Sequence, residues 1–372
     1  MNERHGLIAL NMMEKVGPVA FRSLLDRLGT VEAIFGADER TLLACERVGP
    51  ETAGAIIRQR DCLDPAAEEE RAGALGARIV TMHDAEYPTA LRAIHNAPLV
   101  LYVRGRFAAR DAQAVAIVGT RRPTRYGSDV ASLLASGIAR SKMTVVSGLA
   151  EGIDTHAHRG ALDAGGRTLA VLGGALDCFF PMSNKDLAAA IEGQGAVISE
   201  FPLGRRPDRT TFPMRNRIVS GLSRAVIVVE AGRKSGALIT AREAAEQGRT
   251  VMAVPGRIDV ASSLGCLDLL RDGAVLVRGT DDVFEELDCL LPRPAADARE
   301  SEAGSRHGLN SEELKLVGML ERGECDVDAL IRTSGLQAGV VGSLLLGLEM
   351  RRVIRMLPGR MVELVNQPPA LN

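Results

Sequence analysis

Short runs rich in valine and isoleucine recur between residues 113 and 290 of this 372-residue chain. They lie at 115–118, 144–147, 168–172, 196–199, 225–229, 250–254 and 274–277. Stretches with helical composition separate most of them, such as 128–140, 183–193 and 236–247. Apolar runs that alternate with helices are typical of parallel strands buried on both faces. The pattern therefore predicts an α/β domain with a doubly wound sheet.

The chain before this sheet has a helical pattern. Residues 1–65 predict a small domain of short helices, in which two similar turns, Val16-Gly17-Pro18 and Val48-Gly49-Pro50, each lead into a helical run. Such a repeat resembles SAM-like or helix-hairpin-helix domains. The glycines either present backbone N–H groups to a phosphate or merely cap helices, and the sequence leaves both interpretations open. We place the sheet domain at residues 66–291.

The chain after the sheet divides again. Residues 292–308 are polar and proline-rich and lack periodicity, which is typical of a flexible linker. Residues 309–372 show three helical patterns and then a two-stranded ribbon that turns at Pro358-Gly359, which predicts a winged-helix domain. Its third helix, Gln337 to Met350, carries few basic residues, so we expect contact with protein as readily as with duplex DNA.

The charge of the chain limits how it can bind nucleic acid. The formal net charge is −2, so binding must rest on a local concentration of positive charge. Only five of the 45 basic residues are lysines. Arginine suits bidentate phosphate contacts, although a GC-rich genome produces the same bias. With 11 aromatic residues and no tryptophan, phosphate recognition is expected rather than an extended base-stacking platform.

Cysteine usage and hydropathy indicate the compartment. The six cysteines are scattered without a CxxC pair, which argues against a disulfide framework and a structural zinc site and fits a reducing cytosol. No stretch approaches the length of a membrane span, and the N-terminus lacks a signal-peptide pattern. We expect a cytoplasmic protein that makes no membrane contact.

Glycine-rich and polar segments follow most of the predicted strands. They are 119–127, 147–154, 173–177 with 181–184, 199–202, 212–217, 234–236 and 255–256. Ligands of doubly wound sheets bind beyond the C-terminal ends of the strands, near helix N-termini. Singly, each turn is more often structural, and none is a strict GxGxxG or GxxxxGK[ST] motif. Together they bring arginines and helix N-termini to one edge, which predicts a groove for several phosphates.

Catalytic and metal sites find little support in the sequence. His156 and His158 are two residues apart near a helix start, and no cysteine or carboxylate completes a metal-binding set. Ser147 and Ser235 precede glycines but lie outside a GxSxG elbow. We therefore predict no catalytic residue, no metal and no cofactor.

Two carboxylates at predicted strand ends have alternative roles. Glu200 and Glu230 could act as general bases. They could equally hold arginines such as Arg215 or Arg217 in place, and we expect this second role.

In their order along the chain, these segments resemble the DprA/Smf family of bacterial DNA-processing proteins over residues 80–290. The matching motifs include Ile117-Val118-Gly119-Thr120-Arg121, Ser147-Gly148-Leu149-Ala150, Arg215-Asn216-Arg217-Ile218, Ser235-Gly236-Ala237-Leu238-Ile239-Thr240 and Val254-Pro255-Gly256. Family members commonly add a SAM or helix-hairpin-helix N-terminus and a winged-helix C-terminus. One departure is Met182, where members often have a lysine; the nearby Lys185 is the candidate to replace it.

The resemblance implies an extended Rossmann-like fold that forms a homodimer and binds single-stranded DNA without catalysis. It also implies that the protein loads the RecA recombinase during natural transformation and helps to overcome single-stranded DNA-binding protein. Arg121 would contact phosphate, with backbone donors from Gly119 and Thr120. The full set of predicted DNA-binding residues is Gly119, Thr120, Arg121, Arg122, Ser147, Gly148, Gly173, Asn184, Lys185, Arg215, Asn216, Arg217, Ser235 and Gly236.

Two other functions are alternatives to this one. The first is a nucleotide-handling enzyme similar to the LOG-type phosphoribohydrolases, which position a catalytic glutamate with a PGGxGTxxE helix start. The analogous segment here, Ser235 to Glu243, lacks the leading PGG. The second is a regulator that binds duplex DNA through the winged helix, which a basic third helix would support.

Overall fold

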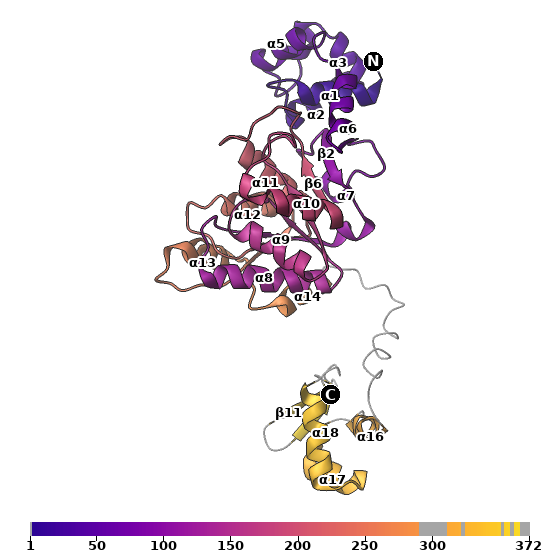
Figure 1. Cartoon of the computed structure of the whole chain (residues 1–372), viewed down its shortest axis with the longest axis vertical. Helices are drawn as coiled ribbons and strands as arrows, with labels where there is room; N and C mark the ends of the chain where they lie inside the picture. Colours follow the sequence, from indigo (N-terminus) through magenta and orange to yellow (C-terminus); the bar gives the residue numbers. More distant parts are fainter. Residues whose placement is uncertain (1, 290–310, 321–323, 351–352, 358–360, 365–372) are drawn as a thin grey trace. The chain divides into compact units, whose positions relative to one another are not determined.

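The computed structural model describes residues 2–289, 311–320, 324–350, 353–357 and 361–364 (Figure 1). The chain divides into two compact units, Met1–Leu290 and Leu291–Asn372, and each is described by itself. The predicted linker, 292–308, lies outside the described residues. The α/β sheet domain predicted from the sequence is confirmed within the first unit.

Six short helices form the start of the first unit, at one end of it in Figure 1. They are α1 (Glu3–Met12), α2 (Pro18–Leu28), α3 (Val31–Gly36), α4 (Glu39–Leu43), α5 (Pro50–Gln59) and α6 (Pro65–Ala74). The two glycine turns are built alike, because Gly17 and Gly49 are the N-caps of α2 and α5 and a proline follows each. Lys15 and Arg47, two residues before these glycines, have left-handed φ angles of 67° and 58°.

A nine-stranded sheet forms the centre of the unit, in the order β1-β2-β6-β5-β4-β3-β7-β8-β9. The strands from β3 to β9 pair in parallel and correspond to the seven apolar runs of the sequence. The first two extend the sheet by antiparallel pairing. The bounds are β1 Arg78–Thr81, β2 Val100–Gly105, β3 Ala114–Val118, β4 Thr144–Ser147, β5 Arg167–Val171, β6 Ala196–Ser199, β7 Ala225–Val228, β8 Thr250–Ala253 and β9 Val275–Leu276.

Helices cover both faces of the sheet. Successive side chains of each strand point to opposite faces, so each buried strand contributes apolar side chains to both. Val115 and Ile117 pack in one apolar cluster with α8, α9 and α14, while Ala116 and Val118 pack in another with α7 and α11–α13. The bounds are α7 Thr89–Arg92, α8 Arg125–Arg140, α9 Ile153–Asp163, α10 Lys185–Gln194, α11 Thr211–Gly221, α12 Ala237–Glu246, α13 Leu264–Arg271 and α14 Thr280–Cys289, with short 3-10 turns at Ala109–Gln113, Met182–Asn184 and Ala261–Ser263.

The strand order places a crevice between β3 and β7. From β3 the chain winds outward through β4, β5 and β6, and then returns to the other side of β3 to form β7. The loops that leave β3 and β7 therefore diverge, and such switch points are where doubly wound sheets bind ligands.

A buried ion pair ties the sheet to the segment before β3. Arg167, the first residue of β5, donates from Nε and Nη2 to Asp111 (2.5 and 2.7 Å). Asp111 also accepts from the Thr144 hydroxyl (2.9 Å) and the Ala108 N–H (2.8 Å). Both charged side chains are more than 90% buried, so each depends on the other for its charge compensation.

The second unit has the elements of a winged helix. Its helices are α16 (Ser311–Leu320), α17 (Val327–Ser334) and α18 (Ala338–Met350), and its small sheet has the order β10-β12-β11. The strands are β10 Cys325–Asp326, β11 Ile354–Leu357 and β12 Met361–Leu364. The sequence of α18 contains no lysine or arginine.

Among the described residues, no single helix is long and apolar enough to cross a membrane. One sharply bent helix pair, Val327–Ser334 with Ala338–Glu349, is together long and apolar enough to do so, by length and composition alone.

Candidate functional site

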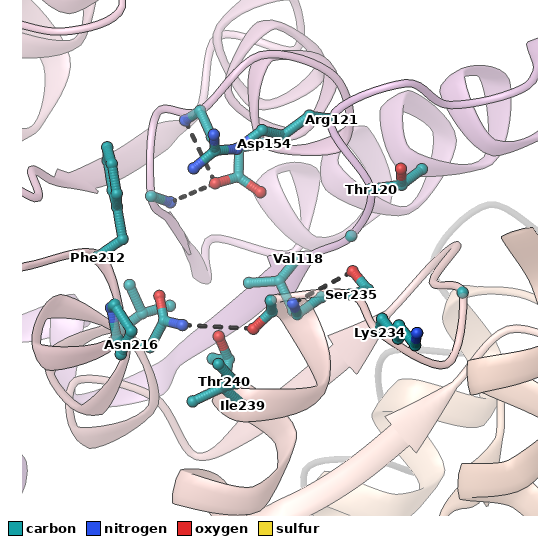
Figure 2. A pocket seen from close by; sticks show the side chains of 18 of the residues that line it. Val118, Thr120, Arg121, Asp154, Phe212, Asn216, Lys234, Ser235, Ile239 and Thr240 are labelled. Atoms are coloured by element: carbon teal, nitrogen blue, oxygen red, sulfur yellow. Dashed lines mark hydrogen bonds between the residues drawn. The ribbon is translucent and has the colours of Figure 1, made fainter. Parts of the chain in front are cut away.

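The switch-point crevice is a cleft of about 540 Å³. Its walls come from the loops after β3, β4 and β7, from the start of α11 and from the turn before α13. Figure 2 shows Arg121 and Asp154 along one side, with Asn216, Ser235 and Lys234 along the other. The cleft brings together these predicted DNA-binding residues: Gly119, Thr120, Arg121, Gly148, Arg215, Asn216, Ser235 and Gly236.

Arg215 is a buried cation that lines this cleft. Only 5% of the residue is exposed, and its Nη1 donates to the Val171 carbonyl (2.6 Å). Its Nε is buried without a hydrogen-bond partner in the described part of the chain. Burial lowers the pKa of Arg215, which the Asp154 charge opposes and the Arg121 charge reinforces. A buried guanidinium beside an open cleft gives the cleft wall a positive charge, which attracts an anion.

The loop after β4 is shaped to admit this guanidinium. Asp154 accepts from the N–H groups of Gly148 (3.1 Å) and Ala150 (3.3 Å), while Leu149 between them has a left-handed φ of 56°. Burial raises the pKa of Asp154, and Arg215 lowers it. A Cβ added to Gly148 would lie 1.7 Å from Nη1 of Arg215. Position 148 therefore requires glycine because the arginine fills the space beside it.

Arg121 lies at the mouth of the cleft and is exposed. Its guanidinium is 4.9 Å from the centroid of the Phe212 ring, within the range of a cation–π contact. Gly119 lets the chain pass close to Ile153 and to the Glu230 carbonyl, which would be 2.5 and 2.9 Å from an added Cβ. The Thr120 N–H already donates to the Glu230 carbonyl (2.7 Å), so this backbone donor is used within the protein.

The two strand-end glutamates organise their surroundings. The expectation that Glu230 holds an arginine was wrong within the described residues: its Oε2 accepts from the N–H (3.0 Å) and hydroxyl (2.9 Å) of Thr124, the N-cap of α8, and its Oε1 is buried without a partner. Glu200 forms a buried ion pair with Arg217, as expected for a carboxylate that holds an arginine. Burial raises the pKa of Glu200, an effect that Arg217 opposes. Neither glutamate is among the residues that line the cleft.

The remaining predicted residues lie beside the cleft rather than in it. Ser147 donates to the Ile117 carbonyl (2.6 Å), and buried Asn184 donates to the Leu149 carbonyl (3.0 Å), so both support the loop after β4. Gly173 leaves room for the Phe212 ring, which would be 2.7 Å from an added Cβ. The others are Arg122, exposed on the loop after β3, Arg217, paired with Glu200, and Lys185, which lines a neighbouring groove at the start of α10.

Among the cleft residues that are missing from the predicted set, three have a charged or aromatic side chain. The Phe212 ring makes a cation–π contact with Arg121, and Asp154 accepts hydrogen bonds from the loop after β4. Lys234 is exposed and lies on the wall formed by the loop after β7. Lys234 directly precedes Ser235-Gly236, so its position before a helix start was the available signal. No group of His, Cys, Asp and Glu that could hold a metal occurs within the described ranges.

His158 is a neutral core histidine behind the cleft. Its Nδ1 is 2.7 Å from the Thr168 hydroxyl, which itself donates to the Val145 carbonyl (2.8 Å). Nδ1 therefore carries the ring proton. Burial and the nearby Arg215 charge lower the pKa of His158 to about 3.

This depressed pKa makes stability depend on pH. Between the ordinary value of 6.5 and about 3, the unfolded chain binds a proton that the folded chain does not, so stability falls as the pH falls. We expect the free energy of unfolding to drop by about 2 kcal/mol more for the natural protein than for His158→Gln between pH 7 and pH 5. Urea unfolding at both pH values measures this difference, and parallel losses in the two proteins would contradict it.

Comparison with known proteins agrees with this geometry. A Rossmann-like sheet with a cationic crevice at its switch point defines a class of anion-binding proteins. The family model for DNA recombination-mediator protein A matches residues 78–288, and that for the DprA winged helix domain matches residues 295–360. The chain therefore belongs to the DprA/Smf family of DNA processing proteins.

Individual relatives extend over most of the first unit. Protein Smf of Synechocystis sp. is 39% identical over 284 residues, which cover 75% of this chain and 71% of the relative. DNA processing protein DprA of Bacillus subtilis is 40% identical and covers 57% of this chain and 72% of its own length. The crystal structure of DprA from Streptococcus pneumoniae superposes with a TM-score of 0.66 at 32% identity, covering 76% of this chain and 96% of that one.

A second solved structure concerns binding directly. It describes the single-stranded DNA binding mode of DNA processing protein A from Helicobacter pylori. It matches with a TM-score of 0.50 at 29% identity and covers 56% of this chain and 98% of that one.

Proposed function

We propose that this chain binds single-stranded DNA at the switch-point cleft and acts without catalysis. The observation that carries the proposal is Arg215, a buried guanidinium that lines an open cleft together with the exposed side chains of Arg121 and Lys234. A phosphate in the cleft would lie near these positive charges in a setting of reduced dielectric, where charge-assisted interactions are strong.

The arrangement of the cleft favours a polymer over a mononucleotide. Its cations belong to three different segments, with Arg121 after β3, Lys234 after β7 and Arg215 on α11. Separated cations suit successive phosphates of one strand. The Phe212 ring offers an apolar contact for a base between them.

The enzymatic alternative gains no support from the position of Glu243. This residue, which stands where the phosphoribohydrolases carry their glutamate, is not among the residues that line the cleft.

The wider role in our proposal follows the family. We propose that the protein acts in the cytoplasm as a homodimer, loads RecA onto the strand during natural transformation, and opposes single-stranded DNA-binding protein. Membership of the family, and the single-stranded DNA binding mode described for the Helicobacter pylori member, support the DNA-binding part of this proposal.

Arg121→Ala is expected to weaken binding to single-stranded DNA and to reduce its salt dependence. Each phosphate contact on a single strand contributes about 0.7 to the slope of log K against log salt. Fluorescence anisotropy with labelled oligo-dT and a matched duplex, over a salt series, measures both effects.

The matched control is Arg125→Ala. Arg125, the first residue of α8, is exposed and contacts Asp129 at 3.8 Å, but it does not line the cleft. Equal slopes of log K against log salt for the natural protein and Arg121→Ala would mean that Arg121 does not contact a phosphate. Absence of single-strand binding by the natural protein would refute the proposed function as a whole.

A further inference from the structure

A groove beside the cleft, here called the Phe180 groove, has a volume of about 660 Å³. It is bounded by the loop after β5, by helix α10 and by the loop that leads into α11. Two hydrogen bonds join the loops, from the Ala175 N–H to the Arg205 carbonyl (2.9 Å) and from the Gly204 N–H to the Asp177 carboxylate (2.9 Å). The groove therefore lies at the same edge of the sheet as the cleft and has walls that are bonded together.

Two phenylalanine rings connect this groove to the cleft. Phe212 lines the cleft and Phe180 lines the groove. Their ring centroids are 6.2 Å apart, and the ring planes are tilted by 55°. The Arg121 guanidinium lies against the other ring, that of Phe212. The three side chains therefore form one surface that begins at the cationic mouth of the cleft and ends in the groove.

Phe180 and Met182 expose apolar surface in this groove. All eight phenylalanines of the chain lie among the described residues, and the other seven are buried or partly buried. Phe180 is 51% exposed, and Met182 is 63% exposed. Apolar surface that stays in water contributes no burial energy, whereas any nucleic-acid base can stack on an aromatic ring. The exposed ring is therefore suited to a base.

The charges that line the groove favour an anionic ligand. Lys185 and Arg206 are exposed, and neither has an ion-pair partner among the described residues. Of the two carboxylates in the lining, Glu192 is paired with Arg104 (3.2 Å), and Asp177 accepts from the neighbouring loop. Three cations against two carboxylates leave a formal charge of +1. The two cations without partners lie close to the exposed apolar side chains, which is the combination that single-strand binders use.

We propose that the single strand continues from the cleft into the Phe180 groove. One base stacks on the Phe180 ring and contacts Met182, and the phosphates that follow it contact Arg206 and Lys185. This inference rests on the proposed function. It adds a base-binding subsite to a cleft whose own cations recognise phosphate.

A single tryptophan can report on the base contact. The chain contains no tryptophan, so Phe180→Trp introduces one emitter at the proposed subsite. Stacking of a thymine on the indole ring quenches its emission. Oligo-dT long enough to reach the groove should therefore quench Phe180→Trp, whereas a short oligonucleotide that fills only the cleft should not. The control is Leu133→Trp, because Leu133 is 65% exposed on α8 and lines neither cavity, so its emission should stay constant.

Phe180→Ala is expected to weaken the binding of long oligo-dT about fivefold or more, which is the loss from one contact between a base and a ring. Phe180→Tyr keeps the ring and should bind like the natural protein. Fluorescence anisotropy with oligonucleotides of increasing length measures both variants. Equal losses in Phe180→Ala and Phe180→Tyr would mean that the ring does not stack on a base.

Arg206→Gln tests the phosphate contact. It is expected to lower the slope of log K against log salt by about 0.7, only for oligonucleotides long enough to reach the groove. The control is Arg140→Gln, because Arg140 is exposed at the end of α8 and lines neither cavity. The slope for this control should equal that of the natural protein at every length.

The outcomes separate this inference from the proposed function. If Arg121→Ala weakens binding but Phe180→Ala and Arg206→Gln bind like the natural protein at every length, the strand does not enter the groove. If Arg121→Ala also has no effect, the proposed function itself fails. A change in the oligomeric state of Phe180→Ala without DNA, measured by sedimentation velocity, would assign the ring to a contact between copies of the chain and overturn the inference.

Discussion

Gly148→Ala is expected to lose most of the affinity for single-stranded DNA, although residue 148 presents no side chain to the ligand. The new Cβ would lie 1.7 Å from Nη1 and 2.2 Å from Cζ of Arg215. The guanidinium would have to move, which breaks its bond to the Val171 carbonyl and withdraws the buried cation from the cleft. Overpacking of this kind costs about 1–3 kcal/mol of stability, so the variant should remain folded.

The control for this prediction is Gly193→Ala, which should bind like the natural protein. Gly193 does not line the cleft, and a Cβ added there meets nothing within 4 Å. Anisotropy measures binding, and a thermal melt shows that both variants are folded. Unchanged binding by folded Gly148→Ala would mean that Arg215 takes no part in DNA binding.

Asp111→Ala is expected to cause the largest loss of stability. The change removes the carboxylate that accepts two hydrogen bonds from Arg167, and leaves a buried guanidinium without its counter-ion. Breaking one side of a buried pair costs about 3–5 kcal/mol. Urea unfolding measures the loss. Asp111 does not line the cleft, so binding by the folded fraction should be unchanged.

An exposed ion pair provides the comparison. Arg257 and Asp259 are 2.7 Å apart, but their side chains are 78% and 60% exposed. Water and salt screen such a pair, so Asp259→Ala should leave the unfolding midpoint where it is. Similar losses in Asp111→Ala and Asp259→Ala would contradict the role given to burial.

Much of the sheet could be predicted because its strands are locally distinctive. Each parallel strand is a continuous apolar run. Such a run can be recognised from its own residues, without knowing which strands pair with it. The antiparallel extension could not be predicted in this way. Arg78–Thr81 and Val100–Gly105 have strand character. They join this sheet because β6 has a hydrogen-bonding edge that β5 does not use, and β2 pairs with it.

Eight of the fourteen predicted DNA-binding residues line the cleft, and their role in DNA binding stays a prediction. Glycine turns at strand ends identify the edge of the sheet where the cleft lies. They do not determine which arginine of α11 faces the cleft. Arg215 and Arg217 are two positions apart, about 200° around a helix, so they cannot share a direction. The packing of Ile218 and Val219 against the sheet orients α11, which turns Arg215 toward the cleft and Arg217 toward Glu200.

The bonds between the two loops of the crevice have a consequence for how a ligand is admitted. The Thr120 N–H donates to the Glu230 carbonyl, and the Glu230 carboxylate accepts from Thr124, so the segments after β3 and β7 are cross-linked. Walls joined in this way keep a constant separation when a ligand enters. Adaptation then falls to the exposed side chains of Arg121 and Lys234, and little backbone entropy is lost on association.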